Sequence, residues 1–324
     1  MYTLYVLVRN LASRGQPLRG AQLRFRDFRL QEIRQGDQAA VRELRRLLRT
    51  DDVNYGDWLL EREYQDAPPT AGQDPAGVGR IPIDAEDTLF LLRLFRPGDL
   101  TFARLAIRLP NDSCVIQTSY RMIGDSLNNS IFPYVIQQDE CASCDRFADD
   151  LVRTPAWGST WFAVARRFFL YGGVKEFSPT WDEVDRLVDY TVALEAALVP
   201  ERDFLGARLR NRAARLISAD ENGANAVVRQ IRSLYEFRSK SVHGAPLSGQ
   251  SRIVLSNEWP GFESLVRVVL VEALRTLPAD DDERIAVLKR IYDVDDNHRA
   301  EKVKQDFRSI TDERIRARLI EELS

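Results

Sequence analysis

Cysteine and histidine are scarce in this chain of 324 residues, which has three cysteines and two histidines. So few cysteines cannot hold a chain of this length together by disulfides, and such a number is typical of a reducing compartment. No uncharged stretch of about 18 residues occurs, so no membrane-spanning helix is expected. The start, MYTLYVLVRNLASRG, has no basic segment before its short apolar run, unlike a signal peptide. We therefore expect a cytoplasmic protein that does not bind a membrane.

Several sequence motifs of common enzyme classes are also missing. The chain has no P-loop, no GxGxxG and no GxSxG, so the nucleotide-binding and hydrolase classes that these motifs mark lose support. Cys141 and Cys144 have the spacing of half a zinc site, but no second pair of ligands completes it, and we expect them in a plain loop. We predict neither a metal nor a cofactor.

The overall composition is that of an ordinary globular protein, with 44% hydrophobic and 29% charged residues. The formal net charge of −3 excludes a general electrostatic attraction of the whole chain to nucleic acid or to anionic membranes. A length of 324 residues suggests two domains. The patterns described next predict an α+β chain, with a β-rich domain over about 1–145 and a helical domain over about 150–324.

The first part of the chain has mainly strand-like patterns. The segment 23–30 alternates apolar and basic residues and then changes phase, as a bulged strand would. The run DTLFLLRLF leads through Arg96-Pro97-Gly98-Asp99 into LTFARLAIRL, which predicts a β-hairpin. One helix is expected where Val41, Leu44, Leu47 and Leu48 share a face. The composition of 66–79 predicts a loop.

The second part has helical periodicity. Helices are expected over 161–169, 180–198, 204–217, 224–242 and 262–277, with short, highly charged helices after them. Thr180 and Glu183 form a capping-box pattern at the start of the second of these helices, and Pro200 ends it.

An arginine interrupts the apolar face of the helix expected over 224–242. That face consists of Val227, Val228, Ile231, Leu234, Tyr235 and Val242. Arg238 takes a position at which this spacing requires an apolar side chain. Because a charge on a core-facing stripe is costly unless a partner or ligand compensates it, Arg238 is a candidate functional residue.

His243 follows Arg238 by five residues, at a point where Gly244 and Pro246 end the helix. On an uninterrupted helix the two side chains would lie about 140° apart, but the helix end allows His243 to turn toward Arg238. Histidine can move the proton of a ribose 2′-hydroxyl or of a leaving oxygen near neutral pH. Arginine stays charged and can hold phosphate oxygens. This pair predicts RNA cleavage by attack of the neighbouring 2′-hydroxyl, without a metal.

Two other interpretations of the pair remain open. In one, Arg238 forms a salt bridge with an acidic neighbour such as Glu195, and His243 only terminates a helix. In the other, the domain is a non-catalytic module that binds RNA or a nucleotide and signals through the N-terminal domain. Incubation with bulk RNA in EDTA separates an enzyme from a binding module, and the accessibility of Arg238 tests the structural interpretation.

Three segments, LVDYTVALEAALVPE, RLRNRAARLIS and LYEFRSKSVHG, resemble the ApeA-like branch of the HEPN superfamily. HEPN domains are helical bundles marked by Arg, four to six residues and His, and here four residues separate Arg238 from His243. Ser239 and Gly244 also match that branch. Other recurring family positions are occupied by Asp189, Glu195, Arg212 and Tyr235. The similarity is clearest over 182–244, and DTLFLLRLFRPGDL is similar to part of the β-rich domain that accompanies this branch.

The resemblance implies a HEPN domain over 150–324, with its core at about 180–280, that acts as a metal-independent endoribonuclease. Such proteins are often toxins or abortive-infection effectors in antiviral defence, and they usually act as homodimers with two Arg/His motifs facing one cleft. The implied partners are an RNA substrate, a second copy of the chain and a regulator such as a phage trigger or an antitoxin. Control by a partner nucleotidyltransferase is not expected, because Ala245 stands where toxins of that kind carry Tyr.

The roles that we expect follow from this chemistry. His243 is the general acid/base and Arg238 the phosphate clamp. Supporting roles are expected for Ser239, Tyr235 and Glu195, with Glu195 orienting Arg238 or joining two helices. Substrate-binding roles are expected for Lys240 and Arg212. A homodimer is expected because one histidine supplies one proton-transfer group, whereas strand scission uses both a base and an acid.

Overall fold

The computed structural model of the chain combines helices with a small antiparallel sheet near the N-terminus, which confirms the α+β class. It describes residues 2–9, 11–12, 23–25, 27–33, 36–48, 51, 53, 57–65, 76–98, 100–108, 114–117, 134–136, 138–174, 182–201, 205–218, 220–242 and 249–292. The chain divides into two units, Met1–Asp149 and Asp150–Ser324, called the N-terminal unit and the C-terminal unit below. The expected boundary at 145–150 adjoins this division.

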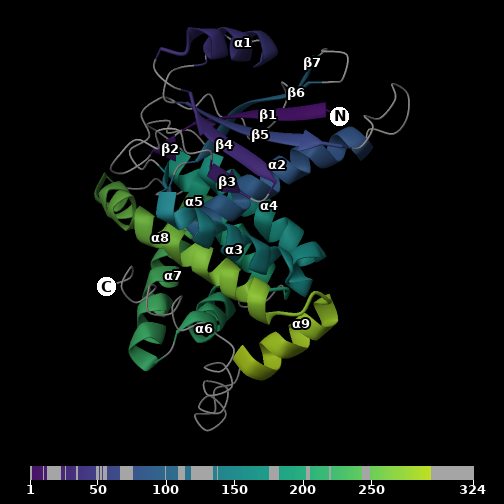
Figure 1. Cartoon of the computed structure of the whole chain (residues 1–324). Coiled ribbons are helices and arrows are strands. Elements are labelled where there is room, and N and C mark those ends of the chain that lie inside the picture. Colours follow the sequence, from purple (N-terminus) through teal and green to yellow (C-terminus); the bar gives the residue numbers. More distant parts are fainter. Residues whose placement is uncertain are drawn as a thin grey trace. The chain divides into compact units, whose positions relative to one another are not determined.

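The N-terminal unit is built on a six-stranded antiparallel sheet (Figure 1). In spatial order its strands are β3 (Leu23–Phe25), β4 (Phe28–Glu32), β5 (Trp58–Tyr64), β1 (Tyr2–Arg9), β6 (Thr101–Arg108) and β7 (Cys114–Gln117). A separate parallel pair consists of β2 (Leu11–Ala12) and β8 (Tyr134–Val135). In the central strand β1, Val6 lies opposite Leu60 of β5 and Leu105 of β6.

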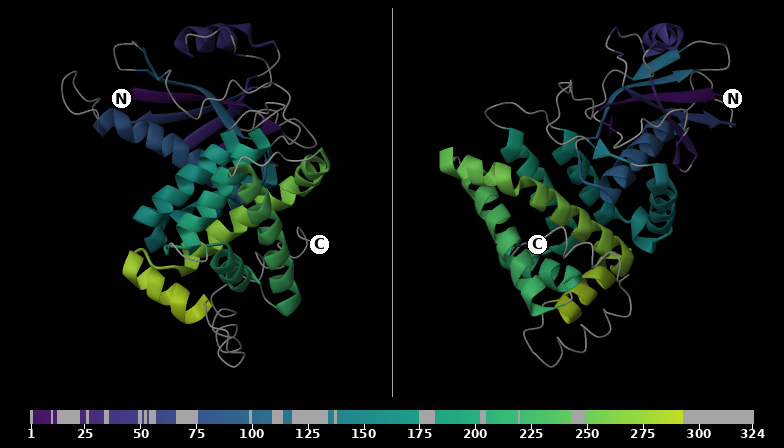
Figure 2. Two further views of the ribbon diagram at one scale, coloured as in Figure 1. Left: turned by 180° about the vertical axis from the view of Figure 1, so that it is seen from behind. Right: turned by 60° about the vertical axis from the view of Figure 1, so that its left-hand side comes forward.

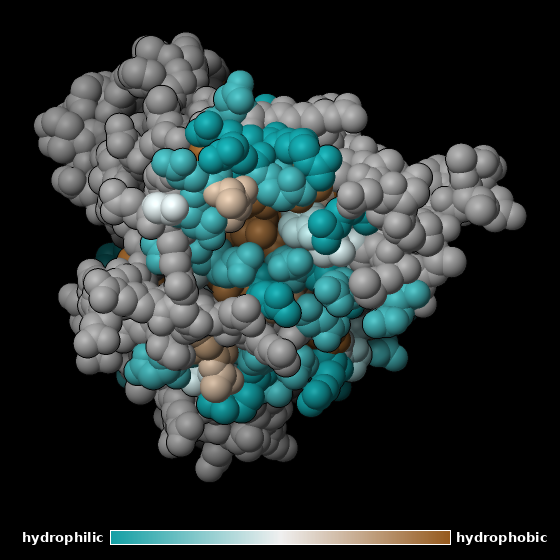
Figure 3. Space-filling model, turned by 45° about the horizontal axis from the view of Figure 1, so that its top comes forward, coloured by the Kyte–Doolittle hydropathy of each residue, from teal (hydrophilic) through white to brown (hydrophobic). Residues whose placement is uncertain are grey.

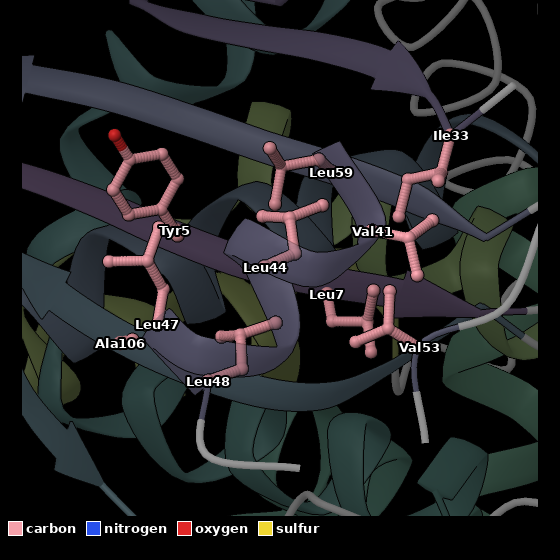
Figure 4. Packing of buried hydrophobic residues seen from close by; sticks show 10 residues of the cluster. All are labelled: Tyr5, Leu7, Ile33, Val41, Leu44, Leu47, Leu48, Val53, Leu59 and Ala106. Atoms are coloured by element: carbon pink, nitrogen blue, oxygen red, sulfur yellow. The ribbon is translucent and has the colours of Figure 1, made fainter. Parts of the chain in front are cut away.

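One face of this sheet is covered by α1 (Gln38–Leu48), whose buried residues are Val41, Leu44, Leu47 and Leu48. Figure 4 shows these side chains pointing toward apolar residues of the sheet and of the adjoining segments. Those residues are Tyr5, Leu7, Ile33, Val53, Leu59 and Ala106. Each Leu or Val that is fully buried in such a layer contributes roughly 1.5–3 kcal/mol to folding. The helix predicted from the four apolar residues is confirmed.

The helix α2 (Ala76–Phe95) lies on the side of the sheet opposite to α1 (Figures 1 and 2). Successive side chains of a strand point to opposite faces, so Leu4 and Val6 of β1 point away from the face that holds Leu7. All three side chains are buried. The near-continuous apolar sequence of β1 therefore reflects a strand that is covered on both faces.

The predicted hairpin between DTLFLLRLF and LTFARLAIRL is wrong, because the first of these segments is the C-terminal half of α2. The second segment forms β6 as expected. The apolar run of α2 is buried on every side, including Leu89, Phe90 and Leu91. A short run that is apolar throughout has no periodicity that separates a buried helix from a buried strand, so pattern alone could not decide.

The phase change in 23–30 is a tight turn between two strands instead of a bulge in one strand. β3 and β4 pair antiparallel, with Leu23 opposite Leu30 and Phe25 opposite Phe28. The chain therefore reverses direction between the two phenylalanines, and both strands keep their own alternation.

The predicted loop over 66–79 is shorter than expected at its C-terminal end. Its last four residues belong to the first turn of α2, which begins at Ala76. The part over 66–75 lies outside the described residues. The prediction for Cys141 and Cys144 is wrong, because a 3₁₀ turn over Gln138–Glu140 leads into α3 (Cys141–Val152), and both cysteines lie in the first turn of that helix.

The C-terminal unit is helical throughout the part that the structure describes (Figure 2). After the 3₁₀ turn Pro155–Gly158 its helices are α4 (Thr160–Val174), α5 (Asp182–Leu198), α6 (Leu205–Ile217), α7 (Glu221–Val242), α8 (Gly249–Thr276) and α9 (Asp281–Val287), followed by the π-helical turn Leu288–Tyr292. The five predicted helices are confirmed, although α8 begins well before the expected start at 262. Thr180 of the predicted capping box lies outside the described residues.

The helix α5 is central to the C-terminal unit, because α4, α6, α7 and α8 all contact it. It approaches α4 closely at Gly172, where an added Cβ would lie 2.7 Å from the ring of Tyr190. The rings of Phe169 and Tyr190 lie 5.5 Å apart in the same contact. Glycine is required at 172 because any side chain would separate the two helices.

The described side chains on the face drawn in Figure 3 are mostly hydrophilic, and apolar ones are visible only in small areas between them. Among the helices that the structure describes, none is long and apolar enough to cross a membrane.

Candidate functional site

The apolar stripe predicted on α7 is present, and Arg238 lies on it. Val227, Ile231 and Leu234 are buried at 2% exposure or less. Because residues four apart lie on the same side of a helix, Arg238 continues the row from Leu234. Val242, the last residue of α7, lies one turn beyond Arg238 and is 52% exposed. The stripe thus passes from the core at Leu234 to the surface at Val242, with Arg238 at the transition.

The guanidinium of Arg238 is partly buried and lacks a protein partner at one nitrogen. Its Nε atom is buried and has no hydrogen-bond acceptor among the described residues. Its Cζ atom lies 5.5 Å from the centre of the Tyr235 ring, within the range of a cation–π interaction. A buried guanidinium N–H without an acceptor is costly, so this position favours a ligand group that can accept a hydrogen bond.

Glu195 of α5 faces Tyr235 and Arg238 from the neighbouring helix. Its carboxylate accepts a hydrogen bond from the Tyr235 hydroxyl and is attracted by the charge of Arg238. Its Oε1 atom is nevertheless buried without a hydrogen-bond donor in the described part of the chain. There is also no ion pair within 4.0 Å between Glu195 and Arg238 among the described residues. We call Glu195, Tyr235 and Arg238 the Arg238 cluster.

Burial dominates the electrostatics of this cluster. Burial raises the pKa of Glu195 above its ordinary value, although the charge of Arg238 and the Tyr235 hydrogen bond act in the opposite direction. Burial and the negative charge of Glu195 also raise the pKa of Tyr235. The cluster therefore places a proton-binding carboxyl beside a permanent positive charge, in surroundings that favour neutral over ionised acids.

Gly206 of α6 is a supporting residue that sequence analysis missed. A Cβ atom at this position would lie 3.1 Å from Cε1 of Tyr235, so the ring packs directly against the backbone of α6. The same ring lies within cation–π range of the Arg238 guanidinium. A glycine inside a predicted amphipathic helix was the available signal, since glycine costs helix stability and is kept where a close approach needs it.

Arg212, for which a substrate-binding role is predicted, has internal partners in this structure. The side chain is 0% exposed, and its Nη1 atom donates to the carbonyl oxygen of Leu198 at 2.6 Å. Its two terminal nitrogens also form a bidentate pair with Glu201, at 2.7 and 2.9 Å. Arg212 cannot reach an external phosphate without breaking this arrangement, so we assign it a structural role.

Lys240 and Ser239 do not share the face of α7 that carries Arg238. Lys240 is exposed, and it follows Arg238 by two residues, which corresponds to about 200° around a helix. Ser239 is partly buried and lies about 100° from Arg238 on the same geometry. A phosphate held by Arg238 would therefore not contact Lys240 directly while α7 stays helical at this point. His243 lies outside the described residues.

The two cysteines of α3 are buried to different extents, with Cys141 half-buried and Cys144 fully buried. Burial raises the pKa of the Cys141 thiol to about 11 and also raises that of Cys144, with the acidic neighbours Asp145 and Glu140 adding to the effect. Neither forms a disulfide among the described residues. Within the ranges that the structure describes, no group of three or more His, Cys, Asp and Glu could hold a metal ion.

Comparisons of the chain with protein-family models, with curated proteins and with solved structures found no significant match.

Proposed function

We propose that this chain is a metal-independent endoribonuclease of the HEPN type, in which Arg238 holds the scissile phosphate and His243 transfers a proton. One observation carries the proposal: the Arg238 guanidinium lies at the edge of the core, yet its Nε has no acceptor among the described residues. Arg212, by contrast, uses both of its terminal nitrogens to bind Glu201 and the Leu198 carbonyl. The open donor of Arg238 supports binding of an anionic ligand.

The chemistry requires few groups. A base removes the proton of the ribose 2′-hydroxyl, and the resulting oxygen attacks the adjacent phosphorus. The bond from phosphorus to the 5′-oxygen then breaks, an acid protonates that oxygen, and the products are a 2′,3′-cyclic phosphate and a 5′-hydroxyl. Arginine stabilises the negative charge that grows on the phosphate oxygens, an effect worth about 10²- to 10³-fold for a single donor in other enzymes. His243 serves as one of the two proton-transfer groups.

The other residues of the cluster have supporting roles in this proposal. Glu195 attracts the Arg238 guanidinium without forming an ion pair, which orients the arginine and leaves donors for the substrate. Tyr235 stacks under the guanidinium and joins α7 to α5. Ser239 is proposed to position the substrate, and Lys240 to contact the RNA at a point away from the phosphate that Arg238 holds.

We propose that a second copy of the chain completes the site. One His243 cannot act as base and acid at the same moment, and a second His243 across a dimer interface would supply the missing group. The wider proposal is a cytoplasmic toxin or abortive-infection effector, switched by a phage component or an antitoxin.

The decisive experiment incubates the purified protein with bulk RNA in EDTA and analyses the product ends. We expect fragments with 2′,3′-cyclic phosphate ends from the wild type and none from His243→Ala at the same concentration. RNA that is bound but remains intact would contradict the enzyme and support a non-catalytic HEPN module that binds RNA or a nucleotide.

The shared site is tested with mixed dimers of wild type and His243→Ala. If both histidines serve one reaction, dilution with the variant lowers the rate per wild-type subunit. An unchanged rate per wild-type subunit would show that each chain cleaves alone.

A further inference from the structure

The C-terminal turn of α5, which carries Glu195, has all four of its terminal carbonyl groups occupied. The last four carbonyls of a helix have no partner within it and need one elsewhere. The carbonyl of Glu195 accepts from the Val199 amide at 2.8 Å. The three that follow, on Ala196, Ala197 and Leu198, accept from two buried arginines on other helices.

Arg284 of α9 holds the first two of those three carbonyls. Its Nη1 atom donates to Ala196 and to Ala197, at 2.8 Å each. Its Nε and Nη2 atoms donate to Oδ1 of Asp281, at 3.2 and 2.8 Å, and its Cζ lies 5.1 Å from the centre of the Trp161 ring. The side chain is 3% exposed. A guanidinium this deeply buried is tolerable because its donors are occupied and because it lies at the negative end of the α5 dipole.

Arg284 is itself held in place by its neighbours. Asp280 caps the start of α9 by accepting from the Glu283 amide at 2.9 Å. The indole N–H of Trp161 donates to the carbonyl of Pro278 at 3.1 Å, which fixes the turn that leads into α9. The start of α9 thus presents Arg284 to α5 in a single orientation.

We infer that Arg284 is a positioning residue that fixes the last turn of α5 and thereby holds the Glu195 carboxylate against Tyr235 and Arg238. The two carbonyls that it binds belong to the residues directly after Glu195. A helix end frays readily when its carbonyls lose their partners, so the position of Glu195 depends on this contact. The catalytic meaning of this inference rests on the proposed function, whereas its structural part can be tested without RNA.

The test replaces Arg284 with lysine, which keeps the charge but cannot bind two carbonyls and a carboxylate in one planar fork. The pKa of Glu195 is measured in the full chain by NMR of ¹³C-labelled glutamate carboxyls, with Glu195→Gln used to assign the signal. We expect the pKa of Glu195 to fall toward its ordinary value in Arg284→Lys, because a loosened turn exposes the carboxyl to water. If the proposed function holds, kcat for RNA cleavage falls about tenfold while KM changes less than about twofold.

The matched control is Arg215→Lys. Arg215 is also an arginine of the C-terminal unit that donates to a backbone carbonyl, that of Tyr292 at 2.6 Å, and that carbonyl does not belong to α5. We expect it to lower stability without changing the pKa of Glu195. If Arg284→Lys behaves in the same way, Arg284 only stabilises the fold and the inference is wrong.

A milder variant covers the case in which Arg284→Lys does not fold. Asp281→Asn keeps the arginine but removes the charge of its side-chain partner, and the Asp281 side chain is 55% exposed. We expect a smaller fall of the Glu195 pKa, and an unchanged value would overturn the inference. The two proposals can fail separately. If the Glu195 pKa differs between Arg284→Lys and the wild type but the wild type does not cleave RNA, only the proposed ribonuclease activity is contradicted.

Discussion

Two pairs of arginine and glutamate in the C-terminal unit illustrate how differently the same residue types can be used. Arg212 and Glu201 form a bidentate pair, the arginine is 0% exposed, and its Nη1 also donates to a helix carbonyl. Arg238 and Glu195 attract each other, but each keeps a buried polar atom without a partner among the described residues. The first pair is complete without a ligand, and the second is not.

The two carboxylates respond to these surroundings in opposite directions. The hydrogen bond from Arg212 lowers the pKa of Glu201, whereas burial raises the pKa of Glu195. The difference teaches that proximity of an arginine does not by itself stabilise a carboxylate. Direct hydrogen bonds to the charged form decide whether the attraction exceeds the cost of burial.

The largest expected effect is a loss of stability when the complete pair is broken. Arg212→Met removes the partner of a partly buried carboxylate and of the Leu198 carbonyl, so the free energy of unfolding should fall by about 3–5 kcal/mol. Urea denaturation followed by circular dichroism measures this change. A loss below about 1 kcal/mol would show that the pair contributes little and would remove the contrast between the two clusters.

The next largest effect concerns activity at the incomplete pair. Arg238→Gln should reduce RNA cleavage about 10²- to 10³-fold, because the phosphate loses its charged donor in the transition state. The free energy of unfolding should change by less than about 1 kcal/mol, since Arg238 forms no ion pair with the described residues. Initial rates and urea denaturation on the same preparation test both parts. Strong destabilisation with little loss of rate per folded molecule would assign Arg238 a structural role.

Packing beneath Tyr235 should give a smaller effect. Gly206→Ala places a methyl group 3.1 Å from the tyrosine ring, and we expect a loss of about 1 kcal/mol in unfolding free energy. Gly223→Ala on α7 is the matched control, because its nearest neighbour would be the Asp220 carboxylate at 3.5 Å. That change should add about 0.5–1 kcal/mol through helix propensity alone. Equal stabilisation of both variants would contradict the close packing of Tyr235 on α6.

The smallest expected effect is an opposite pH dependence of the unfolding free energy in variants of Glu201 and Glu195. The pKa of Glu201 is lowered, so its stabilisation is present above the ordinary value of 4.5 and is lost as the pH falls through the folded pKa. The pKa of Glu195 is raised, so its contribution is full below 4.5 and is lost as the pH rises through the folded pKa. From pH 4 to pH 7, Glu201→Gln should lose stability relative to the wild type and Glu195→Gln should gain it. Urea denaturation of both variants and the wild type at the two pH values measures these differences. A change in the same direction for both variants would contradict the prediction.

Sequence patterns predicted the elements with a clear period and missed those without one. The amphipathic helices α1 and α7 were expected from their apolar stripes, and Arg238 was singled out because it interrupts one of them. The C-terminal half of α2 was mistaken for a strand because its apolar run over 88–92 is buried and has no period that separates a helix from a strand. The contact of Gly206 with Tyr235 joins two helices, and no pattern within one helix contains such information.

The roles of individual charged residues also could not be predicted from sequence patterns. The spacing of Arg212 and Arg238 in the sequence does not indicate which of the two has its donors bound by other residues of the chain. No sequence pattern marked Arg284 as important. The distinction depends on which carbonyls and carboxylates reach each guanidinium from other helices. Such partners lie far apart along the chain, as Arg284 and Ala196 do.

By itself, the sequence determined the α+β class, the helices with a regular apolar period, and the unusual position of Arg238 on an apolar stripe. These features follow from local spacing, because a helix or strand with one face against the core has apolar residues at regular intervals in the sequence. Only the tertiary structure decided that Arg212 pairs with Glu201 and that Glu195, beside Arg238, keeps a carboxylate oxygen without a donor among the described residues. The physical reason is that hydrogen bonding and burial of a charge depend on the three-dimensional arrangement of several helices.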